Sequence, residues 1–498
     1  MALEKPPVLP IATSAERRSC SHRQPCIQPN TTIDRQKGDR VVRLATICLA
    51  SFATGLSGIP LLLALPEPSS TGGLELDNSL SFHRLAHTAL PFSLGAILAA
   101  AFIDPILRHS RACRSFPPFL LVPANILIGT GHAALLLLLL LPPMFRLPRD
   151  LSTALTAAAH LLIGAGSTVN LTTAILLLPR GSSSTPSLLG LINGVLAMGV
   201  VVTQTLCCCT GNMSLDDAGT PRWRHHLAAL ILALSCSCYC CSALFSLASQ
   251  ASSGSGWGTT PAAGGGCEEA EAEAEALDDD DKKKKKILPL QVNRGQGGFP
   301  PPASRLTLLG AVFTFAYQAA MVVVPVWLVL LIGGGGPGSS TGQVPLVYAL
   351  LTFWAGIGVG SLALIPSVER SKQLMFSALV LSTGLLLLVW LFVDVFWNAV
   401  AAAGLVGFFM GPAYPWMVAL LIRETSDEER AGGTAIVIAF GTSGTVTALF
   451  ITQLADQLES PALLHLAVVG LFGGMLMSWN AMLDAKKKPE LMGQGQTT

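Results

Sequence analysis

The stretch Phe353-Trp-Ala-Gly356 in the second half of the chain has a counterpart, Phe92-Ser-Leu-Gly95, in the first half. The two stretches lie 261 residues apart, since 353 − 92 = 261. Three later positions keep this offset: Pro105 with Pro366, Ser110 with Ser371, and Arg111 with Lys372. The pattern predicts an internal repeat, because it lies at helix ends, where similarity due to leucine richness alone is least misleading.

A second, weaker match lies further along each half. Gly164–Asn170 contains a glycine followed by polar residues, and Gly407–Pro415 contains a glycine followed by helix breakers. Aligning Gly166 with Gly411 gives an offset of 245, since 411 − 166 = 245. On this alignment Asn170 and Tyr414 occupy corresponding stretches of the two repeats.

The composition is that of an integral membrane protein. Hydrophobic residues make up 51% of the 498 residues and charged residues 12%, against about 25% charged in soluble domains. The mean hydropathy is +0.56. The formal net charge of +1 gives no basic excess for binding nucleic acid.

Stretches free of Asp, Glu, Lys and Arg predict twelve transmembrane helices. Each has the roughly 20 residues that a helix needs to cross a bilayer, and the longest is divided by Gly333–Pro337. Six lie before a polar insert and six after it: 44–66, 85–103, 115–145, 151–179, 181–215, 225–267, 306–368 (two spans), 373–393, 395–422, 431–455 and 460–483.

The predicted fold is therefore an all-α polytopic membrane protein, with two six-helix repeats around a central cavity. We expect a disordered tail over 1–40, helical bundles over 41–248 and 305–484, a disordered charged linker over 249–304, and a tail over 485–498. With an inside N-terminus, 26 of the 31 Lys and Arg residues fall on the inside. The positive-inside rule then predicts that both termini are cytoplasmic, in the plasma membrane or an internal membrane.

Two repeated halves joined by a charged linker are typical of a transporter with its substrate site between the halves. The chain resembles the major facilitator superfamily, and more narrowly its fungal branch similar to fucose/glucose–proton symporters. The motifs that carry this resemblance are Phe353–Gly356 with Gly360, Gly407–Pro415, and the glycines between Gly432 and Gly444.

The resemblance implies a gate on the cytoplasmic side and a cavity lined by spans one, four, seven and ten, with help from two, five, eight and eleven. The gate residues would be Asp104, Arg108, Arg111 and Arg430, with Asp104 paired to Arg108 or reaching Arg430; ordinary solvated charges are the alternative. The polar and aromatic candidates for the cavity are Asn170, Tyr414, Tyr317, Gln318, Asn193, Gln204 and Trp354. The alternative for these residue types is hydrogen bonding between helices.

Proton coupling has two histidine candidates. No Asp, Glu, Lys or Arg lies in the middle of a predicted span, whereas proton symporters of the resembled branch rely on buried carboxylates. His160 and His132 are the remaining titratable groups. The alternative for each is a neutral imidazole bonded to a nearby backbone carbonyl.

The sequence thus predicts a transporter of a small organic solute, either sugar-like or another neutral polar molecule, that works as a monomer by alternating access. It contains no enzyme motif, and no cofactor or metal site is expected, since no ligand shell surrounds the cysteines. A non-transporting receptor or scaffold with the same fold is the alternative. Of the two glycosylation sequons only Asn212 lies in a predicted outside loop, so Asn212 is the expected site.

Overall fold

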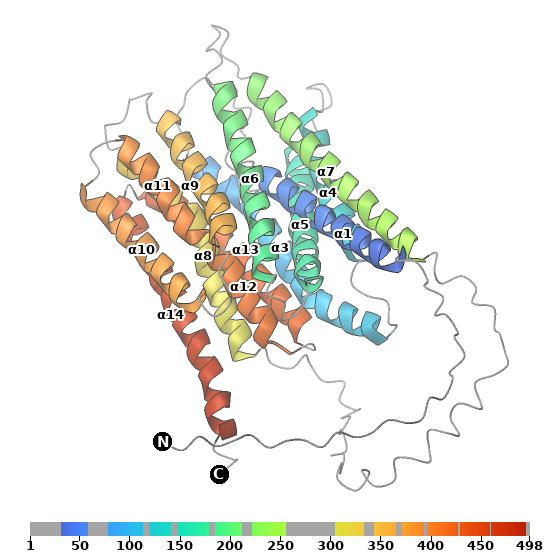
Figure 1. Cartoon of the computed structure of the whole chain (residues 1–498). Helices are drawn as coiled ribbons and strands as arrows, with labels where there is room; N and C mark the ends of the chain where they lie inside the picture. The colour runs from blue at the N-terminus through green and yellow to red at the C-terminus, as the bar shows by residue number, and fades with distance from the viewer. Residues whose placement is uncertain are drawn as a thin grey trace, which may run out of the picture. The chain divides into compact units, whose positions relative to one another are not determined.

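A computed structural model describes residues 31–57, 78–112, 120–140, 148–178, 185–211, 222–254, 304–332, 343–364, 371–392, 396–426, 429–458 and 460–494. The regular elements in these ranges are helices (Figure 1). In the first half they are α1 (Thr31–Ser57), α3 (Asn78–Ala112), α4 (Leu121–Leu140), α5 (Arg149–Leu176), α6 (Thr185–Gly211) and α7 (Arg222–Gly254). In the second half they are α8 (Arg305–Ile332), α9 (Gln343–Ala363), α10 (Ser371–Phe392), α11 (Phe396–Met410), α12 (Ala413–Glu424), α13 (Arg430–Gln457) and α14 (Pro461–Gln494).

The chain divides into two compact units, Met1–Val41 and Val42–Thr498. Of the first unit, the structure describes the start of α1 from Thr31. The structure describes residues 249–254 of the predicted charged linker, at the end of α7, and its last residue, 304. The rest of the linker and the predicted glycosylation site Asn212 lie outside the described residues. The account below concerns the second unit.

Among the described residues, twelve apolar helical segments correspond to the twelve predicted spans. Eight segments are long and apolar enough to cross a bilayer, one of them being Val400–Glu424, which joins α11 and α12. Four shorter apolar helical segments complete the set of twelve (8 + 4): Leu44–Leu56, Thr88–Ile103, Tyr348–Ala363 and Gln373–Leu388. Large apolar side chains such as Leu137, Leu466 and Met477 are exposed on the outer surface, as expected where helices face lipid.

Close glycine contacts confirm the internal repeat. A Cβ atom on Gly164 would lie 2.0 Å from the carbonyl oxygen of Phe92, and a Cβ atom on Gly407 would lie 2.1 Å from that of Phe353. Phe92 and Phe353 are the pair that the sequence repeat aligns. The two halves therefore build the same close crossing, between α3 and α5 in one and between α9 and α11 in the other.

This geometry corrects the alignment of spans four and ten. Gly164 corresponds to Gly407 at an offset of 243 (407 − 164), rather than 245, because both glycines meet the aligned phenylalanine carbonyls. On the corrected offset Asn170 corresponds to Ala413 and Tyr414 to Leu171. A shift of one position along a helix changes the direction of the side chain by about 100°. Asn170 and Tyr414 therefore face different neighbours.

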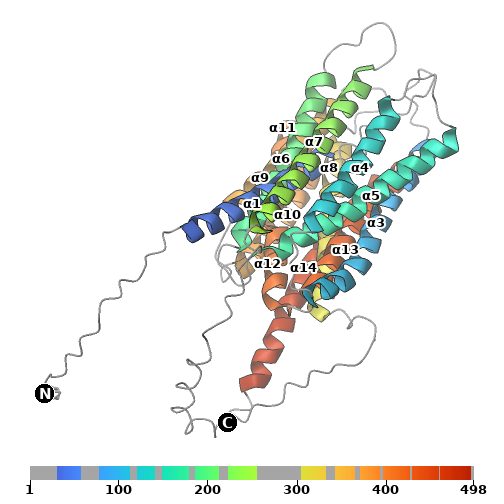
Figure 2. The ribbon, with the colours of Figure 1, turned by 90° about the vertical axis from the view of Figure 1, so that its right-hand side faces the viewer.

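The two halves meet along four principal helix pairs. Helix α3 packs against α13 and α6 against α9, with smaller contacts of α13 with α5 and of α12 with α6. Figure 2 shows α3, α5 and α13 side by side. One of the hydrogen bonds across this boundary joins the hydroxyls of Ser93 and Ser443, 3.1 Å apart.

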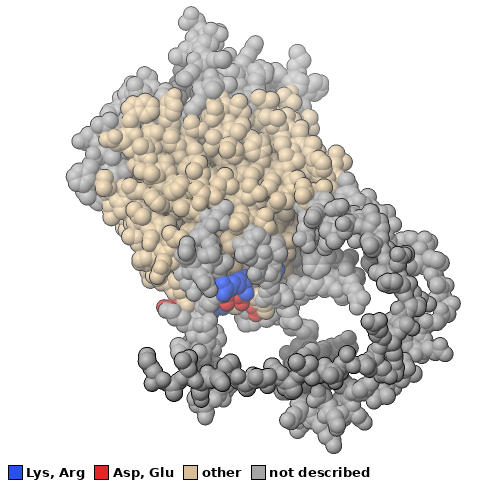
Figure 3. Space-filling model, in the orientation of Figure 1, with Lys and Arg blue, Asp and Glu red and all other residues tan. Residues whose placement is uncertain are grey.

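Charged residues gather at one end of the bundle. Arg305 begins α8, Arg430 begins α13, and Arg423 and Glu424 end α12, with Glu429 one residue before α13. In the face shown in Figure 3, the coloured charged atoms lie at the lower end of an otherwise uncharged surface. We call this the charged end; the ends of α5 and α9 and the start of α6 lie at the same membrane side in the order of the chain.

Candidate functional site

A break in span ten lies at the centre of the candidate site. Helix α11 ends at Met410, Gly411 and Pro412 form a turn, and α12 begins at Ala413. Proline at 412 and at 415 provides no N–H to the carbonyls of Phe408 and Gly411, each four residues back. The predicted distortion at Gly411–Pro415 is therefore present.

Both freed carbonyls are covered by protein. The Gly411 oxygen accepts hydrogen bonds from Nδ2 of Asn193 at 3.2 Å and from the Ser361 hydroxyl at 2.9 Å. The Phe408 oxygen lies against Gly360, where a Cβ atom would be only 2.0 Å away. Unpaired carbonyls at membrane depth are costly, so these contacts explain how the break is tolerated.

Two tyrosines stack beside this break. Tyr317, in the middle of α8, and Tyr414, in α12, have ring centroids 5.9 Å apart and ring planes inclined by 21°. Tyr317 also stacks on Phe313 at 6.4 Å. The sequence-predicted candidates Tyr317 and Tyr414 are therefore brought together.

Asn193 reaches this pair from the other half of the molecule. Its Nδ2 donates to the Ser361 hydroxyl at 2.9 Å, and its side chain lies next to the Tyr317 hydroxyl. That hydroxyl is fully buried and, among the described residues, forms no hydrogen bond of regular geometry. We call Asn193, Tyr317, Ser361, Gly411 and Tyr414 the central cluster; it joins α6 of the first half to α8, α9 and span ten of the second.

Asn170 has a different setting from Asn193. Its Nδ2 lies 3.3 Å from Oδ1 of Asn125 on α4. Asn125 in turn donates to Ser242 on α7 at 2.8 Å, and Ser242 donates to the Thr46 carbonyl on α1 at 3.3 Å. Asn170 thus belongs to a hydrogen-bonded chain through four helices of the first half.

The other predicted cavity residues have separate settings, and no hydrogen bond among the described residues joins them to the central cluster. Gln204 is buried roughly three turns beyond Asn193 on α6. Gln318 follows Tyr317 and packs against Gly441 on α13. Trp354 is buried and meets Phe353 edge to face.

The two histidines are each bonded to their own helix. Nδ1 of His132 lies 2.8 Å from the Ile128 carbonyl oxygen, and Nδ1 of His160 lies 2.8 Å from that of Thr156. The His132 ring also packs against Tyr239 at 5.5 Å, within the first half. This geometry fits the alternative to proton coupling, in which each histidine is buried and hydrogen-bonded to a nearby backbone carbonyl.

Arg430 closes the charged end between the two halves. Its Nη2 donates to the carbonyl oxygens of Ile175 and Leu178 at the end of α5, both at 3.1 Å. Carbonyls at a helix C-terminus carry partial negative charge, which favours a guanidinium there. The side chains of the other predicted gate residues, Asp104, Arg108 and Arg111, lie outside the described residues.

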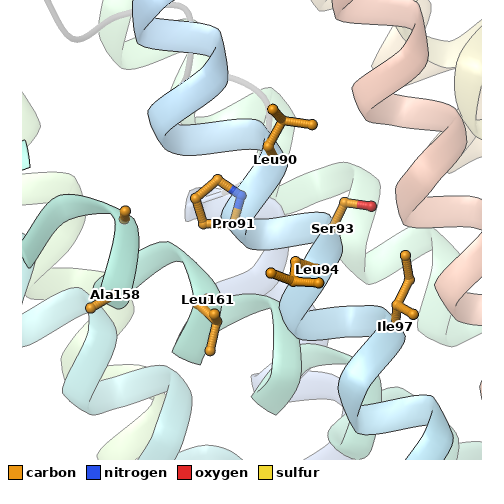
Figure 4. A pocket seen from close by; sticks show the side chains of 8 residues that line it. Leu90, Pro91, Ser93, Leu94, Ile97, Ala158 and Leu161 are labelled. Atoms are coloured by element: carbon orange, nitrogen blue, oxygen red, sulfur yellow. The ribbon is translucent and has the colours of Figure 1, made fainter. Parts of the chain in front are cut away.

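A groove of about 520 Å³ lies elsewhere, between α3 and α5. Its lining is apolar apart from Ser93, and Leu90, Leu94 and Ile97 are exposed. Figure 4 shows the Ser93 hydroxyl directed away from Ala158 and Leu161. An exposed apolar groove of this kind suits the lipid-facing surface and offers no polar contact for a solute.

Solved structures share this architecture. A proton:xylose symporter, XylE, with bound 6-bromo-6-deoxy-D-glucose has a TM-score of 0.58 at 12% identity, covering 90% of this chain and 96% of that one. The transporter FucP in its outward conformation has a TM-score of 0.54 at 16% identity, covering 89% and 99%. A bacterial homologue of the iron transporter ferroportin has a TM-score of 0.52 at 11% identity, covering 89% and 98%.

The chain has the major facilitator fold. No family model matches the sequence, and no curated protein matches it either. At identities of 11–16% the likeness extends to the fold alone. Within the major facilitator fold, the central cluster lies between the two six-helix halves.

Sequence reasoning missed Ser361 and Asn125. Ser361 directly follows Gly360, which the sequence marked as part of a motif, so a hydroxyl next to a close helix crossing was an available signal. Asn125 gave no such signal. An isolated asparagine in an apolar span does not reveal which neighbouring helix it faces.

Proposed function

We propose that this protein transports a small, neutral, hydrogen-bonding organic solute across a membrane by alternating access between its two halves. The central cluster is the proposed solute site. We keep the resemblance to the fungal branch of fucose/glucose–proton symporters as part of the proposal, with the charged end and both termini on the cytoplasmic side.

The observation that supports this proposal best is the Tyr317 hydroxyl. It is fully buried, forms no hydrogen bond of regular geometry among the described residues, and lies beside the Asn193 amide and the ring of Tyr414. A buried polar group without a partner has a cost that a ligand can offset. Phenol, amide and aromatic faces suit a neutral polar solute, and the cluster contains no charged side chain.

Uptake of labelled solutes into vesicles from expressing cells tests the proposal. Fucose and xylose are the first probes, because solved transporters of this fold carry those names, and a wider set of neutral polar metabolites follows. We expect saturable uptake of at least one probe above vector controls. Absence of uptake of every probe, with folded protein present in the membrane, would favour the receptor or scaffold alternative.

Removing the Tyr317 hydroxyl should weaken solute binding without weakening the fold. We expect Tyr317→Phe to reduce apparent affinity by about 1 kcal/mol, the scale of one hydrogen bond, while the melting temperature stays unchanged or rises. Tyr414→Phe should have a similar effect on affinity, and Tyr414→Ala a larger one through lost aromatic packing.

The matched control is Tyr239→Phe. The Tyr239 hydroxyl is 2.7 Å from that of Thr54 inside the first half, so its loss should lower the melting temperature and leave the affinity unchanged. Equal effects of Tyr317→Phe and Tyr239→Phe on uptake would show that Tyr317 has a structural role only.

Transport should depend weakly on an imposed proton gradient. The central cluster has no carboxylate, and His132 and His160 bind their own helix carbonyls. We expect uptake in vesicles to change little when a gradient is imposed or collapsed, and any residual dependence to disappear in His160→Gln. Steep gradient-driven accumulation that survives His160→Gln and His132→Gln together would contradict this.

A further inference from the structure

The Gly411 carbonyl has one donor in each half of the molecule. Pro415 removes the N–H that would normally bind this carbonyl within span ten. Ser361, on α9 of the same half, has a single hydrogen to share between Gly411 and the carbonyl of Ile357, 2.7 Å away. Asn193, on α6 of the other half, supplies the second donor.

We propose that Asn193, Ser361 and Gly411 form a latch on the side of the span-ten break that leads to the charged end. The latch holds the two halves together and opens in each conformational cycle. Asn193 is then a positioning residue that sets the balance between the closed and open forms. This inference rests on the proposed alternating movement of the halves, but it is independent of which solute is carried.

The contacts around the latch place it on the moving boundary. Gly194, next to Asn193, faces Leu362, next to Ser361, so the backbones of α6 and α9 run close together here. Arg430 binds the end of α5 at the charged end, to which this side of the break leads. Separation of the halves at this end must therefore break both hydrogen bonds donated by Asn193.

The second half is built to tolerate that separation. When Asn193 withdraws, the Ser361 hydrogen can turn from Ile357 to Gly411, because Ser361 and Gly411 belong to the same half and stay 2.9 Å apart. Ile357 retains the ordinary hydrogen bonds of a helix interior. The freed carbonyl of the span-ten break therefore keeps a donor in both forms.

The test measures how readily the halves part, from the rate at which a buried cysteine reacts. Ala435 on α13 is fully buried and packs with Ala100 and Ile103 of α3 near the charged end, so Ala435→Cys should react with a water-soluble maleimide only when the halves part. The reaction is followed in detergent by mass spectrometry of the peptide containing residue 435. Adding Asn193→Ala should speed modification about tenfold, equivalent to about 1.4 kcal/mol.

Asn170→Ala is the matched control. Asn170 and Asn193 lie in the same half and are similarly buried, with 6% and 7% of their surface exposed. The Asn170 amide, however, donates its hydrogen bond to a residue of that same half. We expect Asn170→Ala to leave the rate within about twofold of the parent. Asn193→Leu, which keeps the side-chain volume without donors, should reproduce the effect of Asn193→Ala if the latter folds poorly.

An unchanged rate in both Asn193 variants, or equal acceleration by Asn170→Ala, would overturn the latch. The experiment uses no solute. A protein that opens but fails every uptake assay would contradict the proposed function and leave the latch intact.

Discussion

Gly360→Ala is expected to prevent stable folding of the second half. The new Cβ atom would lie 2.0 Å from the Phe408 carbonyl oxygen and 2.8 Å from its carbon, and both are helix backbone that no side-chain rotation can clear. Helices α9 and α11 would have to separate, which would also uncover the carbonyl that Pro412 leaves without a helix donor. We expect a loss of at least about 3 kcal/mol, at the upper end for overpacking.

The measurement is size-exclusion chromatography and thermal melting of the purified protein. Gly384→Ala on α10 is the control, because no heavy atom lies within 4 Å of its added Cβ atom and alanine favours a helix over glycine by up to about 1 kcal/mol. Gly384→Ala should therefore melt at or slightly above the parent temperature. A Gly360→Ala protein that elutes and melts like the parent would refute the close crossing of α9 and α11.

The glycine pattern shows how far the sequence determined the fold. The charge-free stretches predicted all twelve spans, and the pairing of Phe92 with Phe353 predicted an internal repeat. In the structure this repeat is seen as the same helix crossing in each half. The second alignment was wrong by two residues, because each span contains several glycines and the pair that corresponds is Gly164 with Gly407, not Gly166 with Gly411. The contact that defines the correct alignment joins a glycine to a phenylalanine carbonyl on the neighbouring helix. Residue spacing within a single span does not show which residue of another helix a glycine contacts.

The candidate site was less predictable than the fold. Proline chemistry predicted the distortion at Gly411–Pro415, and Asn193, Tyr317 and Tyr414 were named from residue type and from the spans that line the cavity in the resembled family. The two donors to the freed Gly411 carbonyl, Asn193 and Ser361, lie 218 and 50 residues away from it in the chain, so local sequence could not pair them. Asn170 and Asn193 looked equivalent in sequence, yet one bonds within a half and the other between halves.

Arg430 illustrates the same limit for charge. The sequence placed it at a membrane boundary and suggested an acidic partner, Asp104. Among the described residues Arg430 binds two carbonyl oxygens at the end of α5, which no charged side chain marks in the sequence. The Asp104 side chain lies outside the described residues, so its pairing with Arg430 stays a prediction. The unpaired carbonyls at a helix C-terminus belong to the backbone. Every residue has such a group, so the amino-acid sequence does not mark these carbonyls as partners for an arginine.

A disulfide between the halves should stop transport. Ala197 on α6 and Gly358 on α9 face each other, and a Cβ atom on Gly358 would lie 3.5 Å from that of Ala197 without a clash. This separation is within the range of about 3.5–4.5 Å found in disulfides. Ala197→Cys with Gly358→Cys should therefore cross-link on mild oxidation and hold the charged end closed, with at least a tenfold loss of transport.

The measurement that tests alternating access most directly is uptake by proteoliposomes containing this double variant, using the solute identified in the vesicle assay. Each single variant is the control for oxidation of the native cysteines, and the extent of cross-linking is read by mass spectrometry. The account predicts that uptake by the double variant falls at least tenfold on oxidation and returns with reductant, while both single variants are unaffected. Uptake at the parent rate by fully cross-linked protein would contradict a transport cycle in which the two halves separate at the charged end.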